Sequence, residues 1–534
     1  MSEFKKNELW VSLVKVKDSS PQKIAVYFHS HEITYGDLYD RAYRLSFSLL
    51  RMGIKKGDCI ALLSANRPEY LELLFACSRI GAVLAPLNSR YGSSDLHAAL
   101  VACDASVLFL TPRFRNQDFI SIFKDACLNS KSEPISSVTY KSMPSLNTVV
   151  LLEEDKRLDN AILYQTLFDE KDPIHAVEGF PNMPVLVLFT SGSSGAPKPI
   201  LLTQTQLVNC AENLIQRQGI TTDDCILSFL PYFHVYGGVL TTLVPLLAGS
   251  SLVIQEAFDS TLSLNAVQIY RCTVIYSIAP CWQAWLDHSD LKKFDLSSIR
   301  TGICASGSIG SSAVPKRVRA MFGEMFTQYG MTETTGVATM SCPNDSEYLV
   351  TETAGRPLPG VEISIFDNET KSWLGCDSEG EICIRSNMMS PGYVGHFGLR
   401  SLDSNGWLHT GDRGFMGRDG YLRVIGRLDD RLRSGGENID PIEVEQFLGT
   451  HIDVLRAFVV GVPDSRLGEI PVVFIILKKE GALNESQIID YCVGRIANFK
   501  IPHKVFFTDD VPGGLHKVQR YKLKVDAKHR LKIT

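Results

Sequence analysis

The first 180 residues alternate between hydrophobic patterns typical of helices and patterns typical of buried strands. Residues 35–53 carry apolar side chains at helical spacing, and residues 57–63 then run from a Gly-Asp turn into an uninterrupted apolar segment. Residues 69–80 repeat the helical pattern, and residues 83–87 form a second apolar run. Because a strand–helix–strand order typically places its strands parallel, we predict mainly parallel sheets flanked by helices.

From about residue 360 the pattern changes to short strands separated by glycine and aspartate. Residues 361–366, 381–385 and 421–425 are the clearest of these strands, and they predict a small β-rich subdomain. The remaining chain contains a predicted helix, two strands and a second helix, at residues 441–448, 455–461, 471–477 and 485–497.

These patterns predict an α/β protein of two domains. The chain has 534 residues, which is too long for one hydrophobic core. We expect a large N-terminal domain over residues 1–428, which includes the β-rich subdomain. Residues 429–534 are then a small, mobile α+β C-terminal domain, with a hinge near residue 429.

The composition is that of an ordinary globular protein, with 45% hydrophobic and 21% charged residues. A net charge of −5 and the lack of a long basic stripe argue against a nucleic-acid partner. The 13 cysteines contain no C-x-x-C pair, which favours reduced thiols over disulfides or a zinc site. The sequence shows no signal-peptide core, no transmembrane segment and no peroxisomal C-terminal tripeptide, so we expect a cytoplasmic protein.

A loop of hydroxyl and glycine residues follows the apolar segment 185–189. Such a loop donates hydroxyl and backbone N–H groups to phosphate oxygens, and its lysine adds a positive charge. It is not the common P-loop, because Pro197 and Pro199 replace the glycine and the hydroxyl residue of that motif. Taken alone, it would be interpreted as a surface loop. Its candidate phosphate ligands are Thr190, Ser191, Gly192, Ser193, Ser194, Gly195 and Lys198.

Residues 329–334 combine an aromatic ring, hydroxyl groups and a carboxylate. Tyr329 could stack on a purine, Thr332 could donate to phosphate, and Glu333 offers the hard oxygen atoms that Mg²⁺ prefers. The alternative is a strand end with a solvated glutamate, which is equally compatible with this segment alone.

Two further segments offer contacts to ribose. Asp412 ends the segment WLHTGD and suits vicinal hydroxyl groups, and the Arg427 guanidinium could hold ribose or phosphate. Taken singly, a turn aspartate and a surface ion pair are the more ordinary interpretations.

Four other segments are ambiguous on their own. The turn at 432–439 carries Arg433 and Gly436, but it also resembles the approach to a helix. The basic run 516–522 is ordinarily a solvated surface. Segments 231–237 and 305–308 could line an organic substrate pocket or belong to the core.

In this order and spacing, the segments resemble the adenylate-forming superfamily of acyl-CoA synthetases, beetle luciferases and peptide-synthetase adenylation domains. The resemblance runs from about Thr34 to Lys524, and its most specific parts are TSGSSGAPK, YGMTE, HTGD, GR-x-DD and SGGEN. It implies an acid–CoA ligase that joins a small carboxylic acid to AMP, releases pyrophosphate and passes the acyl group to CoA. The implied co-substrates and cofactor are ATP, CoA and Mg²⁺.

The resemblance also implies roles for individual residues. Residues 190–198 would cover the ATP phosphates, Tyr329 would stack on adenine, and Asp412 and Arg427 would bind ribose. Catalysis would fall to Lys517, Thr332 and Glu333, of which Glu333 would hold Mg²⁺. The remaining implied residues are His234, Ser306, Gly307 and Gln328 around the acid, Asp429 at the hinge, and Arg433 and Gly436 at the thiol-transfer face. Gln328 would also border ATP.

The sequence departs from the family pattern beside two of these positions. His516 stands where the family usually has glycine before the tail lysine. This difference affects the reach and geometry expected for Lys517. Gln328 stands where many long-chain enzymes have glycine, and its larger side chain favours short, aromatic or otherwise compact acids.

Three other functions use the same motifs. They are loading of a carrier-protein thiol, luciferase-like oxidation of the adenylate, and nucleotide binding by an inactive pseudo-ligase. Neither the acid nor the oligomeric state follows from the sequence.

Overall fold

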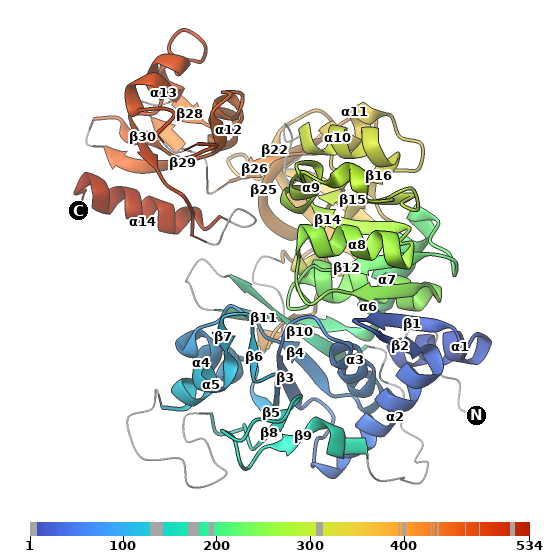
Figure 1. Ribbon diagram of the computed structural model, residues 1–534. Helices are drawn as coiled ribbons and strands as arrows, with labels where there is room; N and C mark the ends of the chain where they lie inside the picture. Colours follow the sequence, from blue (N-terminus) through green and yellow to red (C-terminus); the bar gives the residue numbers. More distant parts are fainter. Residues whose placement is uncertain are drawn as a thin grey trace.

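The computed structural model describes residues 8–128, 143–168, 180, 182–191, 197–305, 313–394, 396–397, 402–428, 430, 432–434, 437–464, 466–479, 481–512 and 518–533. Among these residues, two large sheets and a β-rich part of two smaller sheets form the main body. A smaller C-terminal domain lies beside the β-rich sheet (Figure 1). The α/β architecture predicted from the hydrophobic pattern is confirmed.

The nine-stranded sheet contains the first β-α-β units of the chain. The strands from β10 through β4, β3, β5 and β8 to β9 pair in parallel, whereas the pairs β10–β11, β11–β23 and β23–β24 are antiparallel. Its order is β24 (His396–Phe397), β23 (Gly392–Tyr393), β11 (Pro197–Thr203), β10 (Pro184–Ser191), β4 (Val83–Pro86), β3 (Cys59–Leu63), β5 (Ala105–Leu110), β8 (Thr148–Leu151) and β9 (Ile162–Leu163).

Helices cover both faces of this sheet (Figure 1). Helices α2 (Tyr35–Arg51) and α3 (Pro68–Ile80) pack on one face, and α4 (Ser93–Ala102) and α5 (Phe119–Leu128) pack on the other. Thr34 caps the start of α2: its side chain accepts a hydrogen bond from the Asp37 backbone N–H, and the Asp37 carboxylate accepts one from the Thr34 backbone N–H. Helix α3 ends at Gly81, which adopts the left-handed conformation with φ +76°.

The seven-stranded sheet is parallel except for its β1–β2 edge. Its order is β16 (Glu324–Phe326), β15 (Thr301–Ala305), β14 (Val274–Ile278), β12 (Cys225–Ser228), β13 (Ser251–Ile254), β1 (Ile24–Phe28) and β2 (His31–Thr34). Its covering helices are α1 (Leu9–Ser19), α6 (Gln204–Gln218) and α7 (Thr241–Ala248) on one face, and α8 (Ser260–Tyr270), α9 (Ala279–Leu286) and α10 (Ala313–Phe322) on the other.

One hydrophobic core joins the two large sheets. It contains buried side chains of α2 and α3 together with those of α6 and α7, so the helices between the sheets share their packing. Three short 3-10 segments and a hairpin complete this part: η1 (Tyr164–Phe168), η3 (Leu291–Lys293), η4 (Thr332–Thr334), and β6 (Arg113–Phe114) with β7 (Gln117–Asp118).

Two antiparallel sheets form the β-rich part, which is drawn in yellow to orange in Figure 1. The three-stranded sheet contains β17 (Gln328–Tyr329), β18 (Thr339–Met340) and β19 (Arg356–Pro357), and α11 (Glu347–Glu352) lies between the last two in the chain. The five-stranded sheet has the order β21 (Ser372–Leu374), β20 (Val361–Asp367), β22 (Gly380–Ser386), β25 (Leu408–Met416) and β26 (Leu422–Arg427).

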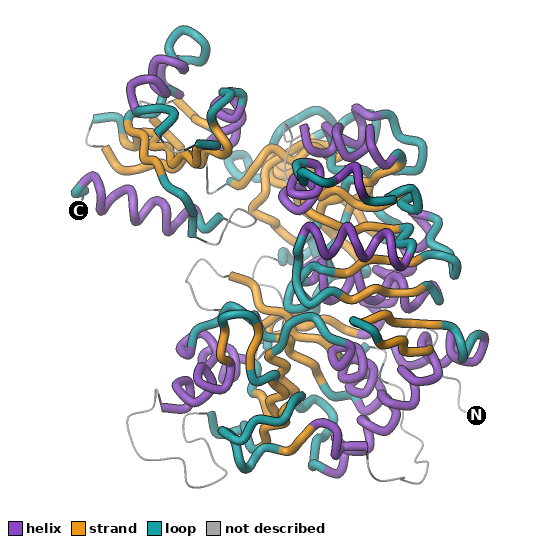
Figure 2. Tube along the Cα trace, viewed as in Figure 1, coloured by secondary structure: helices purple, strands orange, loops and turns teal. Residues whose placement is uncertain are grey.

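The C-terminal domain has hydrophobic clusters of its own, formed by residues between Leu432 and Ile533. Figure 2 shows its strands enclosed by helices on several sides. Its strands are β27 (Leu432–Ser434), β28 (Glu437–Ile439), β29 (Val454–Asp464), β30 (Gly468–Leu477) and β31 (Lys504–Phe507). Its helices are α12 (Pro441–Gly449), α13 (Glu485–Cys492), the 3-10 turn η5 (Asn498–Lys500) and α14 (Arg520–Leu531).

One predicted boundary is wrong. The pattern predicts a helix over 485–497, but α13 ends at Cys492. Gly494 follows with φ +71°, a conformation that favours glycine and does not continue a right-handed helix. The apolar residues beyond this point therefore pack from a loop and a 3-10 turn.

Candidate functional site

Three residues predicted to contact adenosine lie together in the β-rich part. Asp412 on β25 is paired in register with Arg427 on β26. The Arg427 Nη1 atom donates to Asp412 Oδ1 at 2.7 Å, and the Tyr329 hydroxyl donates to Asp412 Oδ2 at 2.7 Å. Burial, followed by the Asp412 carboxylate, raises the pKa of Tyr329 well above its usual value, so its hydroxyl keeps its proton. This arrangement places a ring, a carboxylate and a guanidinium within one small cluster.

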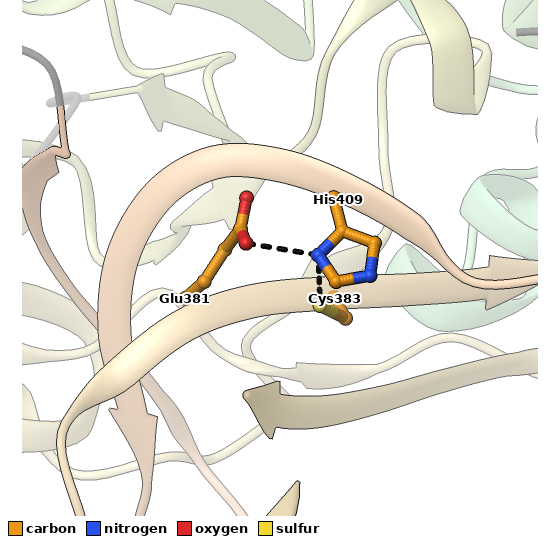
Figure 3. Close-up of side chains that lie close together, drawn as sticks. All are labelled: Glu381, Cys383 and His409. Atoms are coloured by element: carbon orange, nitrogen blue, oxygen red, sulfur yellow. Dashed lines mark hydrogen bonds and ion pairs between the residues drawn. The ribbon is translucent and has the colours of Figure 1, made fainter. Parts of the chain in front are cut away.

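A buried carboxylate supports the turn that precedes Asp412. Glu381 on β22 accepts hydrogen bonds from the backbone N–H of Gly411, from Nδ1 of His409 and from Nδ2 of Asn368, each at 2.9 Å. Figure 3 shows Glu381 and Cys383 on one strand, with both side chains turned toward His409. Because Gly411 is adjacent to Asp412, Glu381 fixes the position of the carboxylate that faces Tyr329 and Arg427.

Glu381, Cys383 and His409 form a group whose role is structural, because it supports the turn before Asp412. The ligand atoms of Glu381, Cys383 and His409 lie within 4.8 Å of one another, and the Cys383 sulfur is 3.5 Å from His409 Nδ1. Burial raises the pKa of Cys383 to about 12, so its thiol is protonated near neutral pH. Burial also works to raise the pKa of Glu381, but hydrogen bonds from His409, Asn368 and Gly411 outweigh it, and the pKa is lowered.

Glu333 lies beside the strands that flank the predicted phosphate loop. The Tyr393 hydroxyl donates to Glu333 Oε1 at 3.4 Å, and Tyr393 on β23 is paired with Ile200 on β11. The backbone oxygen of Glu333 accepts a hydrogen bond from Ser390, whose hydroxyl in turn donates to the backbone oxygen of Leu201. The 3-10 turn of Thr332 and Glu333 is therefore fixed against β11.

The predicted phosphate loop connects two antiparallel strands. Thr190 on β10 is paired in register with Lys198 on β11, so both ends of the loop meet at the same point. Residues 192–196 lie outside the described residues. The strand that carries Lys198 pairs with β23, and Tyr393 of β23 contacts Glu333, so the two loop strands lie close to Glu333.

His234 lies in a loop that packs closely against the next helical segment. Its exposed side chain precedes a π-helical turn, Tyr236–Leu240, of a kind that is frequent at functional sites. A Cβ atom on Gly238 would lie 2.2 Å from the backbone oxygen of Tyr232, so glycine is required for this close approach. Val235 contacts Gly336, which brings the His234 loop next to the segment that carries Glu333.

Gln328 contributes a buried polar atom. Its Oε1 atom has no hydrogen-bond partner among the described residues, although Gln328 precedes Tyr329 on β17. A buried amide oxygen without a partner is unfavourable, and a ligand donor would satisfy it.

Most of the other predicted residues lie outside the described part of the chain. Those outside the described residues are Gly192, Ser193, Ser194, Gly195, Ser306, Gly307, Asp429, Gly436 and Lys517. Ser191 and Arg433 are described by their backbone alone, in β10 and β27.

Sequence reasoning missed the residues that support the site. Tyr393 donates to Glu333, while Glu381 holds the backbone of Gly411, the neighbour of Asp412, and is itself held by His409. All three lie on strands whose pairing is set by the whole fold. His409 could have been predicted from the sequence, because it stands three positions before Asp412 in the same motif.

An ion pair links this site to the C-terminal domain. Arg413, the residue after Asp412, is buried and contacts the carboxylates of Glu379 and of Asp440. Asp440 also accepts a hydrogen bond at 2.9 Å from the backbone N–H of Ile442, and so caps α12. The strand that bears Asp412 is thereby connected to the small domain.

The fold is that of an α/β protein with a large N-terminal and a small C-terminal domain, and it brings together Tyr329, Asp412 and Arg427, the residues predicted to contact adenosine. In the part of the chain that the structure describes, none of the helices combines the length and apolar character needed to cross a bilayer. The chain belongs to the AMP-binding enzyme family, whose main domain matches residues 14–394 and whose C-terminal domain matches residues 443–513. The resemblance stated from the motifs is confirmed.

Several characterised proteins are similar along nearly the whole chain. The indoleacetate–CoA ligase of Aromatoleum aromaticum is 32% identical over 499 residues, covering 92% of each chain. The acyl-CoA ligase SID4 of Ajellomyces capsulatus is 31% identical over 487 residues, covering 89% of this chain and 81% of that protein. The solved structure of o-succinylbenzoate CoA synthetase from Bacillus subtilis, in complex with its acyl-adenylate intermediate, is 25% identical with a TM-score of 0.79, covering 97% of this chain and 98% of that chain.

Proposed function

We propose that this protein is an ATP-dependent acid–CoA ligase. It adenylates a carboxylic acid, releases pyrophosphate, and then transfers the acyl group to the thiol of CoA with release of AMP. The observation that carries this proposal is the cluster of Tyr329, Asp412 and Arg427 near the strands that flank the predicted phosphate loop. The names of the similar proteins, which are CoA ligases and a CoA synthetase, support the same reaction.

The site provides the contacts that adenosine requires. The Tyr329 ring would stack on adenine, while Asp412 would accept hydrogen bonds from the ribose hydroxyls. Arg427 contacts the same carboxylate and would orient it toward the sugar. Residues 190–198, with Lys198 at their end, would donate to the phosphate oxygens.

Glu333 fits the role of a Mg²⁺ ligand. Its carboxylate offers hard oxygen atoms, and Tyr393 and Ser390 hold it beside the loop strands. A bound Mg²⁺ would offset the negative charge of the phosphates.

In the first step a carboxylate oxygen attacks the α-phosphorus and pyrophosphate leaves. Two anions must approach each other, so positive charge has to be aimed at the reacting oxygens. We assign this role to Lys517, with Thr332 donating to phosphate. Loss of one such aimed donor typically costs on the order of 10²–10³ in rate.

In the second step the thiol attacks the acyl carbonyl and AMP leaves. A lysine at the α-phosphate would obstruct the entering thiol, so a rotation of the small domain about Asp429 resolves the conflict. We place the domain boundary between residues 428 and 429, and we assign Arg433 and Gly436 to the face that serves thiol transfer.

The acid is compact. We place it near His234, Ser306, Gly307 and Gln328, where the Gln328 side chain narrows the pocket compared with glycine. The name of the indoleacetate–CoA ligase, a relative that acts on a compact aromatic acid, supports this size class.

We also propose that the enzyme works in a reducing compartment, with the cytoplasm as its location. None of the 13 cysteines forms a disulfide, and most are buried.

The test is a panel of short, aromatic and long-chain acids, read first by pyrophosphate release and then by thioester formation with free CoA. We expect acid-dependent release with compact acids and accumulation of their CoA thioesters. Adenylation without transfer to CoA would instead indicate a carrier-protein thiol or a luciferase-like reaction. Nucleotide binding with no pyrophosphate release from any acid would indicate a pseudo-ligase.

A further inference from the structure

Two neighbouring strands of the β-rich sheet bring three metal-binding side chains together. Glu381 and Cys383 lie on β22, and His409 lies on β25, where it is paired in register with Cys383. Residues two apart on a strand point to the same face, so the carboxylate and the thiol both reach the imidazole (Figure 3). The imidazole stands 28 positions after the carboxylate and 26 after the thiol, so only the strand pairing makes them neighbours.

The separations of the three atoms are close to those that one tetrahedral ion imposes. With Zn²⁺ bonds of about 2.3 Å to sulfur and about 2.0–2.2 Å to nitrogen and oxygen, the ligand atoms lie about 3.4–3.6 Å apart. The Cys383 Sγ atom is 3.5 Å from His409 Nδ1, and the Glu381 Oε2 atom is 2.9 Å from the same nitrogen. All three atoms lie within 4.8 Å of one another. Small side-chain movements would therefore seat an ion between them.

The donor types favour a thiophilic ion over Mg²⁺. Thiolate and imidazole are typical ligands of Zn²⁺, whereas Mg²⁺ prefers oxygen atoms in octahedral geometry. On binding, the Cys383 thiol would lose its proton to solvent, and the His409 proton would reside on Nε2 so that Nδ1 can coordinate. This chemistry differs from that of Glu333, the proposed Mg²⁺ ligand.

Other residues already hold two of the three ligands in place. Asn368 Nδ2 donates to Oε2 of Glu381, and the Gly411 N–H donates to Oε1, each at 2.9 Å. The Phe366 ring meets the His409 imidazole edge-on, with 5.1 Å between the ring centroids. Outer contacts of this kind orient metal ligands and raise the affinity for the ion.

The imidazole gives an ion access to the two buried ligands. The side chain of His409 is 25% exposed, whereas that of Glu381 is 7% exposed and Cys383 is fully buried. An ion would therefore enter past the imidazole. Three protein ligands leave the fourth tetrahedral position for a water molecule on this open side.

We propose that Glu381, Cys383 and His409, besides supporting the turn before Asp412, bind a thiophilic divalent cation such as Zn²⁺. The absence of C-x-x-C pairs from the sequence does not bear on this site, because it uses a single cysteine. Since Glu381 also holds the N–H of Gly411, the ion would add a fixed point beside the adenosine cluster. The site is independent of the proposed reaction, and its test needs no acid, ATP or CoA.

The test is a titration of the full chain with Zn²⁺, with the thiols kept reduced, no nucleotide present and Mg²⁺ in large excess. Competition with a chromophoric zinc chelator measures the affinity. We expect one tightly bound ion per chain. Cys383→Ser should lower the affinity by at least the roughly 10- to 100-fold that loss of an outer contact alone typically costs. Cys376→Ser, which removes an exposed cysteine between β21 and β22, is the matched control and should bind like the wild type.

Cadmium identifies the sulfur ligand directly. Cd²⁺ bound to a thiolate gives a charge-transfer absorption in the ultraviolet, which we expect in the wild type and in Cys376→Ser but not in Cys383→Ser. His409→Phe keeps every thiol and a ring against Phe366 but removes both nitrogen atoms, so it should also lose affinity for Zn²⁺. Thermal unfolding of each metal-free variant shows whether it is folded.

The variants separate this site from binding elsewhere on the protein. Equal Zn²⁺ affinity of the wild type and Cys383→Ser, or a loss in Cys376→Ser instead, would mean an adventitious ion only and would overturn the proposal. Unchanged affinity in His409→Phe would equally contradict a site of three residues. If Cys383→Ser does not fold, the affinity of His409→Phe and the cadmium absorption of the wild type still decide.

Discussion

Gly238 sits where the backbone of the His234 loop passes too close for a side chain. A Cβ atom there would lie 2.2 Å from the Tyr232 backbone oxygen and 2.9 Å from the hydroxyl of Tyr70. We expect Gly238→Ala to lower the free energy of unfolding by about 1–3 kcal/mol, because the loop must shift to relieve the clash. Gly375→Ala, where a Cβ meets no atom within 4 Å, is the matched control in urea unfolding. Equal stability of the two variants would contradict the close packing.

Glu381 gives a prediction with a defined pH dependence. Its carboxylate accepts three hydrogen bonds, and Glu381→Gln would turn an N–H group toward at least one of these donors. We expect the variant to lose about 1–3 kcal/mol of unfolding free energy at pH 7. The KM for ATP should also rise, because the turn before Asp412 loses its support.

The sign of the pH effect follows from the lowered pKa of Glu381. A carboxyl group with a lowered folded-state pKa stabilises the protein above its unfolded pKa, about 4.3, and loses this contribution as the pH falls. The stability difference between wild type and Glu381→Gln should therefore narrow below about pH 4.3. Urea unfolding at pH 7 and at successively lower pH checks this, and a difference that widens would contradict the role of the ionised carboxylate.

At the scale of elements, the sequence predicted helices and strands with a clear hydrophobic pattern better than the strands that carry the candidate site. The uninterrupted apolar run before residue 63 became β3, and the periodic segment after Thr34 became α2. Strand β25 was harder to foresee, because its Gly411 and Asp412 are typical of turns. Only pairing with β22 and β26 makes this segment a strand, and such pairing depends on residues far away in the sequence.

The candidate site was likewise predicted only in part. Tyr329, Asp412 and Arg427 were named from motifs, and the structure brings these three together. The unpartnered Gln328 oxygen and the supporting role of Glu381 could not be predicted, because both depend on burial in the folded chain.

The β25–β26 pair carries a prediction on nucleotide binding. Asp412→Asn replaces one carboxylate oxygen by an N–H₂ group, which opposes either the Tyr329 hydroxyl or the Arg427 guanidinium. We expect the KM for ATP to rise roughly 10- to 100-fold, the effect of losing a hydrogen bond to a charged group. Tyr329→Phe keeps the ring and should raise the KM less. A larger rise in the KM for ATP from Tyr329→Phe than from Asp412→Asn would show that Asp412 does not make the ribose contact.

At the scale of the whole molecule, Arg413 and Asp440 connect the two domains. Asp440→Asn keeps a side chain that can cap α12 but removes the charge that faces buried Arg413. In a double-mutant cycle with Arg413→Met, we expect a coupling free energy of about 0.5–3 kcal/mol. Unfolding of the wild type, both single variants and the double variant measures it. Strictly additive effects would show that this pair does not hold the domains together.

The division of the reaction between two faces of the small domain is tested by Lys517→Ala. Acid-dependent exchange of pyrophosphate into ATP reports the first step, and CoA thioester formation from chemically prepared acyl-adenylate reports the second. The account predicts that the wild type performs both and that Lys517→Ala loses exchange by on the order of 10²-fold or more while thioester formation stays largely intact. Equal loss of both reactions in Lys517→Ala, or a wild type that exchanges no pyrophosphate with any acid, would contradict the account.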